Sequence, residues 1–422
     1  MIELRLARTV PADVEPVEET GTLAEIRERA GRLARDLAPG TSTTLARPGL
    51  AGAELAAFVE GLLLGGYRFT LATLPERGAA PAPAVVELAG VTDAAAVARG
   101  SQAAAATAWA RDLANTPSLT KNPAWLGAQA STRLRKLGAE VDVHDEKWLA
   151  DNGFGGVLAV GGGSATPPRL IEARWRPRGA ATTPHVVLVG KGITFDTGGI
   201  NLKPGDSMKA MKTDMGGGAA VLAALGLVAE RELPIRVTAL VPAAENAFGG
   251  SSYRPSDVVR HVNGRTSEIT NTDAEGRVVL ADAMAYAVAR LRPSVLVDIA
   301  TLTGAIKVAL GEKVAGLFAT DDTLAADLAA AGESTGEPLW RMPLADDYES
   351  TLASSIADAN NAPGNPGAIT AALFLRHFAG DVPWAHLDIA GTGRSGKDDG
   401  IVAKGATGFG ARLLAAFVEA QL

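Results

Sequence analysis

The chain contains no cysteine, and this absence excludes several kinds of site and reaction. A disulfide framework, a zinc ribbon, an iron–sulfur cluster and a cysteine nucleophile all need that side chain. Any metal ion that the protein holds must therefore be bound through oxygen or nitrogen ligands.

The sequence also lacks a long apolar run and an excess of basic residues. No stretch of about 18 uncharged apolar residues occurs, and the first residues, Met1 to Arg5, lack the basic and apolar regions of a secretion signal. The 40 Lys and Arg stand against 47 Asp and Glu, a net charge of −7, which argues against nucleic acid or an anionic membrane as a partner. We expect a cytoplasmic protein without a membrane segment.

What is present is the composition of a folded protein, with 47% hydrophobic and 21% charged residues. At roughly 150 residues per domain, the 422 residues suggest two domains, or one large domain with a smaller one. An alanine-rich stretch from Thr92 to Leu113 predicts one long helix that ends near Asn115. We therefore expect a small segment over residues 1–91, a connecting helix over 92–114 and a larger segment over 115–422.

In the larger segment, apolar runs typical of strands alternate with helical stretches. This alternation predicts a largely parallel, buried sheet flanked by helices. Functional sites of such sheets lie beyond the carboxyl ends of the strands. The predicted strands are Val186 to Gly190, Arg236 to Val241, Val295 to Thr301 and His386 to Ala390, and the predicted helices are Gly217 to Arg231, Arg277 to Arg290 and Gly408 to Glu419.

Two glycine-rich segments after predicted strands concentrate the polar residues that could carry chemistry. One runs from Val189 through Lys203 to Gly217, and the other from Asn271 to Arg277. Together they supply four carboxylates, Asp196, Asp214, Asp273 and Glu275, with the cations Lys191, Lys203 and Arg277 nearby in the sequence.

Four carboxylates brought together would repel one another unless cations compensate them, and two divalent ions would supply the matching positive charge. Such a pair of ions, about 3.5–4 Å apart, can generate hydroxide at neutral pH and polarise a carbonyl group. Each acid taken alone is also typical of a helix cap or turn, and Asp214 and Asp273 could cap the helices that follow them. The spacing thus predicts a carboxylate metal site and names no substrate.

A third glycine-rich segment, Gly391 to Lys397, has the spacing of a phosphate-binding Walker loop. Asp398 stands where Ser or Thr should bind magnesium, and no helical pattern follows. We interpret this segment as a loop.

The segment Asn271-Thr272-Asp273-Ala274-Glu275-Gly276-Arg277 resembles the signature of the leucyl aminopeptidase (cytosol aminopeptidase) family, and Val189 to Gly199 resembles its other metal-binding segment. The similarity spans about residues 110 to 420. Further matching segments are Met211 to Gly217, Ala300 to Gly304, Trp384 to Ala390 and Gly405 to Phe409.

The resemblance implies an α/β fold with a small N-terminal α/β domain, a connecting helix and a larger C-terminal catalytic domain built on a mainly parallel sheet. It further implies a metal-dependent aminopeptidase that hydrolyses the N-terminal peptide bond of peptides with a two-metal-activated water. Peptides with a free N-terminus would be its substrates, and the chain would assemble as a homo-hexamer. The segment before the connecting helix, residues 1–91, is shorter than in family members and looks trimmed.

The resemblance also assigns roles to the polar residues. Asp196 and Glu275 would bridge two divalent ions, zinc or manganese or else magnesium, while Lys191 and Asp214 complete one site and Asp273 the other. A lysine ligand must be neutral, which two adjacent cations make feasible. Lys203 would stabilise the oxyanion, and Arg277 would hold a bicarbonate or water that acts as base. The expected substrate pocket is lined by Met211, Thr301, Leu302 and Gly304.

Two other functions stay open at this point. A pair of metal ions also serves phosphoesterases, and some proteins of the family combine catalysis with DNA binding, so that a DNA-binding or scaffold protein could retain the fold. The intact Lys203 and Arg277 favour the aminopeptidase, and the net charge of −7 weighs against DNA.

Overall fold

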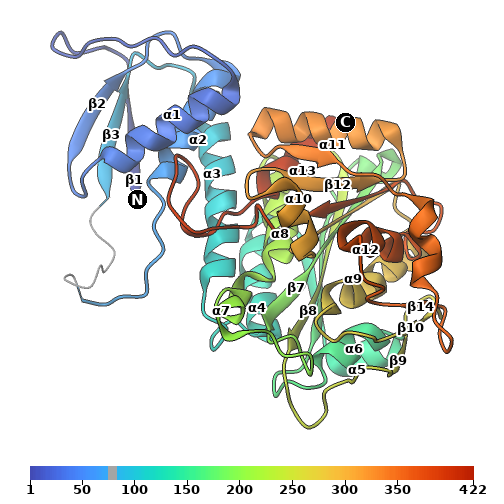
Figure 1. The fold of residues 1–422 in the computed structure, drawn as a ribbon. Helices are drawn as coiled ribbons and strands as arrows, with labels where there is room; N and C mark the ends of the chain where they lie inside the picture. The colour runs from blue at the N-terminus through green and yellow to red at the C-terminus, as the bar shows by residue number, and fades with distance from the viewer. Residues whose placement is uncertain (75–82) are drawn as a thin grey trace.

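The computed structural model describes residues 1–74 and 83–422, and its N-terminal part is a small sheet with two helices. Strands β1 (Ile2–Ala7), β3 (Ala84–Ala89) and β2 (Ser42–Ala46) pair in parallel in this order. Helices α1 (Leu23–Asp36) and α2 (Gly52–Gly65) share an apolar core with this sheet. Figure 1 shows this unit at one side of the molecule.

Helix α3 (Ala94–Asn115) stands between this unit and the rest of the chain (Figure 1). Asp93 caps it by accepting a hydrogen bond of 3.0 Å from the backbone N–H of Ala96. The long helix predicted from Thr92 to Leu113 is thus confirmed to within two residues at each end. The division of the chain into domains at residues 91 and 114 stays a prediction.

The remainder of the chain is built on a nine-stranded sheet, which confirms the predicted fold class. Its order is β13-β12-β15-β11-β6-β8-β5-β4, with β7 paired to β8. The four central strands β15, β11, β6 and β8 are parallel, so their carboxyl ends share one edge. The strands are β4 (Glu140–His144), β5 (Arg169–Trp175), β6 (His185–Gly190), β7 (Gly192–Asp196), β8 (Arg236–Asn246), β11 (Val295–Ala300), β12 (Ala315–Ala319), β13 (Leu339–Arg341) and β15 (Trp384–Asp388).

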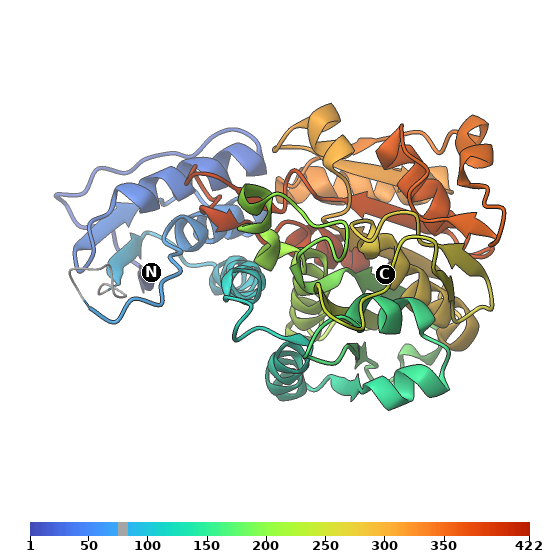
Figure 2. The same cartoon turned by 60° about the horizontal axis from the view of Figure 1, so that its bottom comes forward.

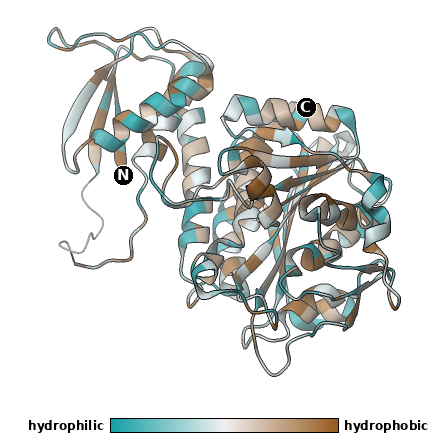
Figure 3. Ribbon diagram, viewed as in Figure 1, coloured by the Kyte–Doolittle hydropathy of each residue, from teal (hydrophilic) through white to brown (hydrophobic). Residues whose placement is uncertain are grey.

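Helices cover both faces of this sheet, and two separate apolar cores result (Figure 2). One core contains α3, α4 (Pro123–Leu134), α8 (Gly216–Glu230), α11 (Asp322–Thr335) and α13 (Ala411–Ala420). The other contains α5 (Glu146–Asp151), α6 (Gly155–Gly161), α9 (Glu275–Tyr286), α10 (Gly304–Leu310) and α12 (Gly367–Arg376). Figure 3 shows hydrophobic residues concentrated in the sheet between these layers, as expected for strands buried on both faces.

Smaller elements decorate the edges of the large sheet. Strands β14 (Ala359–Asn360), β10 (Thr266–Glu268) and β9 (Val258–Arg260) form a second sheet, and β16 (Arg394–Ser395) pairs with β17 (Gly405–Ala406). Helix α7 is the short segment Gly205–Met208. Among residues 1–74 and 83–422, no helix combines the length and the apolar character that crossing a bilayer requires.

Several predicted boundaries differ from the observed ones for local physical reasons. Helix α9 begins at Glu275 rather than Arg277, with its acid in the first turn where the helix dipole favours it. Helix α13 begins at Ala411 rather than Gly408, because Gly408 and Gly410 adopt φ of +71° and +94°, which a right-handed helix does not allow. Strand β8 continues to Asn246, and β15 ends at Asp388 instead of Ala390. The segment Gly391 to Lys397 is a loop with one short strand, as interpreted from the sequence.

Buried ion pairs connect the N-terminal helices to the C-terminal part. Glu60 on α2 forms an ion pair with Arg27 on α1, at 2.8 Å between Oε1 and Nε, and also pairs with Arg412 on α13. Arg412 pairs in turn with Glu337, at 3.2 Å between Nη2 and Oε1. All four side chains are buried, so each charge depends on its partners for compensation.

We expect Glu60→Gln to lower the free energy of unfolding by about 3–5 kcal/mol, because it leaves two buried guanidinium groups short of a carboxylate. Denaturant unfolding followed by circular dichroism measures the change. The exposed pair Glu3 and Arg5 gives the matched control: Glu3→Gln should cost no more than about 0.5 kcal/mol. Equal losses in the two variants would contradict the assignment of a stabilising role to the buried network.

Candidate active site

The eleven residues that the sequence singled out line one cavity of about 410 Å³. It opens where β6, β7 and β11 end, which is the edge expected for a functional site. The structure thus brings together segments more than 100 residues apart. The eleven are Lys191, Asp196, Lys203, Met211, Asp214, Asp273, Glu275, Arg277, Thr301, Leu302 and Gly304.

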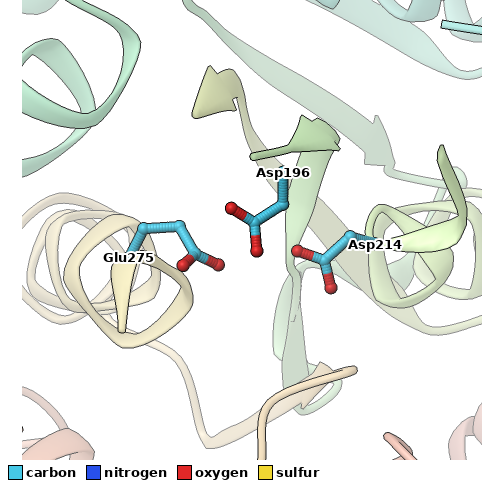
Figure 4. Close-up of side chains that lie close together, drawn as sticks. All are labelled: Asp196, Asp214 and Glu275. Carbon is cyan, nitrogen blue, oxygen red and sulfur yellow. The ribbon is translucent and has the colours of Figure 1, made fainter. Parts of the chain in front are cut away.

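Three of the four carboxylates converge on one point. Asp196 ends β7, Asp214 precedes α8 and Glu275 opens α9, and each offers an oxygen that lies within 4.8 Å of the other two. Figure 4 shows the three carboxylate groups turned toward one another. All three residues are buried, with relative exposure of 1%, 6% and 1% respectively. Asp273 lies outside this group but on the wall of the same cavity.

Two lysines lie among the carboxylates, and each pairs with two of them. Lys191 Nζ is 2.8 Å from Asp214 Oδ2 and 2.7 Å from Glu275 Oε1. Lys203 Nζ is 2.9 Å from Asp196 Oδ2 and also contacts Asp273 Oδ1. The four acids and two lysines leave the cluster with an excess of negative charge when all are ionised.

Burial and the excess of negative charge both shift the pKa values of these groups. Burial raises the pKa of both Asp214 and Glu275, and the nearby charge of Asp196 raises each further, against the opposing effect of Lys191. Burial alone would lower the pKa of Lys191, but Asp214 and Glu275 raise it well above its usual value. In this arrangement Lys191 is therefore protonated, and it could ligate a metal only after losing that proton.

The residues present fit divalent cations. Glu275 Oε2 is buried and accepts no hydrogen bond from any described residue, which is costly for a carboxylate oxygen that faces no cation. Carboxylate oxygens with a nitrogen donor suit manganese, magnesium and zinc. The structure therefore offers a donor set and an unsatisfied oxygen for such ions.

Arg277 lies on α9 at the same cavity and is 8% exposed. Its Nε has no hydrogen-bond partner among the described residues, and burial lowers the pKa of its guanidinium to about 10. A buried guanidinium with free donors is suited to hold a small planar anion such as a carboxylate or a bicarbonate.

Neither acid acts as the helix cap that the sequence left open. The helices α8 and α9 begin without a side-chain cap. The Asp214 carboxylate instead accepts from Thr301 Oγ1 at 2.7 Å, and the Asp273 carboxylate faces Lys203. Both acids thus point to the cavity, not to the helix ends.

Asn246, at the end of β8, is a supporting residue that the sequence did not single out. Its Nδ2 donates to Asp196 Oδ1 at 2.8 Å and to the carbonyl of Thr272 at 3.0 Å. It therefore ties the first polar segment to the second. The signal that could have identified Asn246 is its place as a polar residue at the end of an apolar strand. It was missed because the predicted strand ended at Val241, five residues earlier.

Asp388, at the end of β15, supports the opposite wall. Its carboxylate accepts from the backbone N–H of Leu302 at 3.1 Å and from Thr303 Oγ1 at 2.6 Å. These bonds fix the loop that carries Thr301, Leu302 and Gly304. In the sequence, Asp388 belongs to a segment that resembles the family, but the resemblance assigned it no role.

Gly276 shows why the second polar segment needs glycine inside a helix. A Cβ atom at this position would lie 2.7 Å from Lys191 Cε and 2.8 Å from its Nζ, closer than real Cβ contacts. Only glycine lets α9 approach the lysine this closely.

Comparisons with known proteins agree with this arrangement. Residues 108–415 match the cytosol aminopeptidase family, catalytic domain. The probable cytosol aminopeptidase of Roseiflexus castenholzii is 48% identical over 367 residues, which are 85% of this chain and 75% of that protein. That of Leifsonia xyli is 44% identical over 409 residues, 93% of this chain and 82% of that protein.

Solved structures agree as well. The bottromycin maturation enzyme BotP in complex with Mn superposes with a TM-score of 0.88 at 37% identity, covering 99% of this chain and 98% of that one. The cytosol aminopeptidase from Coxiella burnetii gives 0.86 at 37% identity, covering 94% of this chain and 84% of that one. The resemblance noted in the sequence is thus confirmed, and the chain belongs to the cytosol aminopeptidase family of hydrolases.

Proposed function

We propose that the chain removes the N-terminal residue from peptides with the help of two divalent metal ions, held by Lys191, Asp196, Asp214, Asp273 and Glu275. The observation that carries this proposal is the buried cluster of Asp196, Asp214 and Glu275, set within 4.8 Å in a member of a metal-dependent peptidase family. Neither a phosphoesterase nor a DNA-binding scaffold is favoured, because the family match is to peptidases.

Bound divalent ions would supply an activated water and polarise the peptide carbonyl. Asp196 and Glu275 are proposed as the bridging ligands, and their almost complete burial in the cluster supports this role. Asp196 is held by Asn246, so its carboxylate keeps one orientation. Lys191 and Asp214 would complete one site, and Asp273 the other.

Lys203 and Arg277 are proposed to act on the reacting groups. Lys203 Nζ would donate a hydrogen bond to the carbonyl oxygen of the scissile peptide as negative charge develops on it. Its contacts with Asp196 and Asp273 support this role, because they keep the ammonium charged and near the carboxylates. Arg277 would hold a bicarbonate or water that takes up the proton of the attacking water.

The remaining features of the proposal concern the substrate, the metal and the assembly. Met211, Thr301, Leu302 and Gly304 line the cavity and would receive the first side chain of the peptide. Manganese is the ion we propose first, because the similar BotP structure contains Mn, with zinc and magnesium as alternatives. A homo-hexamer and a cytoplasmic location complete the proposal, in keeping with the resemblance and with the name of the relatives.

The purified chain, loaded with Mn²⁺, should hydrolyse leucine anilide and leucyl peptides, and exhaustive chelation should abolish the activity. N-acetylated versions of the same peptides should be resistant, because the free α-amino group is part of the recognised substrate. Release of free leucine measures both results. Cleavage of a phosphate ester without cleavage of any peptide would overturn the proposed function.

We expect Asp196→Asn and Glu275→Gln to lose bound metal, because each removes a buried negative charge from the cluster. Metal content after gel filtration and titration calorimetry with Mn²⁺ measure the loss. Asp206→Asn, which alters an exposed acid on the nearby helix α7, is the matched control and should bind metal normally. Unchanged stoichiometry in both cluster variants would show that the ligands have been assigned wrongly.

Removal of Lys203 and removal of Lys191 should cause different defects, the first in catalysis and the second in metal binding. Lys203→Ala should keep both metal ions and lower kcat by about 10²–10³-fold, as loss of one oxyanion donor does. Lys191→Ala should instead weaken metal binding, and Arg277→Ala should be the mildest, because water can partly replace a held bicarbonate. Metal content and kinetics are measured on all three variants. Metal loss in Lys203→Ala with retention in Lys191→Ala would reverse the two assignments.

A further inference from the structure

A second cavity, of about 570 Å³, adjoins the proposed active site. Most of its wall comes from three parts of the chain, which are residues 67–69 after α2, the end of α3, and the hairpin of β16 and β17, and Lys212 and Glu312 complete it. Arg394 of β16 lines both cavities. Lys212, on the wall of the second cavity, directly follows Met211 on the wall of the first. The two cavities are therefore neighbours with a common wall.

The second cavity carries an excess of positive charge, although the chain as a whole is acidic. Its wall contains four cationic residues and two acidic ones. Both acids are already engaged elsewhere: Glu312 pairs with Lys307 at 2.7 Å, and Asp398 pairs with Arg35 of α1 at 3.2 Å. Among the described residues, none of the four cations has a carboxylate within ion-pair distance. They are Arg68, Lys212, Arg394 and Lys404.

The guanidinium of Arg394 makes no hydrogen bond with any described residue, and it differs in this from Lys212 and Arg68. Lys212 Nζ is held by the carbonyl of Asn115 at 2.7 Å, and Arg68 Nη1 by the carbonyl of Gly65 at 2.9 Å. Arg394 is half-buried, so its charge is partly shielded from bulk water. Its donors remain free for a group that enters either cavity.

We propose that Arg394 binds a carboxylate of the substrate, so that the enzyme prefers peptides with an acidic group close to the scissile bond. This inference rests on the proposed function. An arginine can hold a carboxylate through two parallel hydrogen bonds, and the neighbouring cations add attraction without competing acids. The carboxylate can come from the first side chain, from the second side chain, or from the C-terminus of a short peptide.

Three pairs of peptides test the proposal and identify the source of the carboxylate. Glu-Ala-Ala amide against Gln-Ala-Ala amide tests the first side chain, and Leu-Glu-Ala amide against Leu-Gln-Ala amide tests the second. Leu-Ala-Ala as free acid against its amide tests the C-terminus. In at least one pair the acidic member should have a KM lower by about tenfold, the size expected for one charge-assisted hydrogen bond. The ratio should decrease as salt is raised.

Variants of the hairpin show whether Arg394 is responsible. Arg394→Gln should bring the ratio within the preferred pair close to one, and Arg394→Lys should restore part of it, because lysine keeps the charge without the paired donors. Lys397→Gln is the matched control, because it removes one positive charge from the same loop at a side chain that lines neither cavity. It should keep the wild-type ratio and activity.

Failure of this inference differs from failure of the proposed function. If the metal-loaded enzyme hydrolyses neutral and acidic peptides equally well, or if Arg394→Gln retains the preference, Arg394 has no such role and the aminopeptidase stands. If no peptide is cleaved, the proposed function fails, and calorimetric binding of the same pairs decides the role of Arg394. Tighter binding of the acidic member by the wild type, lost in Arg394→Gln, supports the role, and equal binding overturns it.

Discussion

The arrangement of the site depends on one electrostatic constraint, which is that several carboxylates are buried within a few ångströms of one another. Each of Asp196, Asp214 and Glu275 is at most 6% exposed, so water screens the repulsion between their charges only weakly. Lys191 and Lys203 offset part of the charge, and each is held between two acids. The two lysines leave part of the negative charge uncompensated, and the carboxylate oxygens of the cluster are ligands that divalent ions use.

Holding such a cluster in place requires support from outside it. Asn246 fixes one oxygen of Asp196 and at the same time the carbonyl of Thr272, while Asp388 fixes the loop on the far wall. These bonds run between strand ends and loops of the same sheet edge, so the parallel sheet and the cluster stabilise each other's geometry. The close packing of Gly276 on Lys191 also keeps the lysine in place, because any side chain at position 276 would displace it.

The sequence was sufficient for features that depend on short segments and insufficient for those that depend on pairs distant in the chain. The alternation of strands and helices, the helix α3 and the seven charged residues of the cavity follow from local patterns and from two intact motifs. The other four cavity residues were expected only from the resemblance to the family. Asn246 was missed because the predicted strand stopped before it and its partners Asp196 and Thr272 lie on other segments. Arg394 was missed because the two cavities that it lines are formed by segments distant in the sequence. The start of α13 was misplaced because Gly408 and Gly410 have positive φ, which delays the helix without breaking the apolar pattern.

The N-terminal unit is connected to the site through the loop that follows Arg394. Arg35 of α1 donates to the carbonyls of Gly400 and Val402, both at 2.6 Å, and Arg111 of α3 donates to those of Ile401 and Thr407, both at 2.8 Å. These contacts anchor the segment between β16 and β17, and the residue that follows β17, from the N-terminal side. Since residues 67–69 also form part of the second cavity, the short N-terminal unit shapes the wall next to the proposed active site. Its sequence therefore bears on which peptides the proposed site can accept, even though the proposed metal ligands all belong to the C-terminal part.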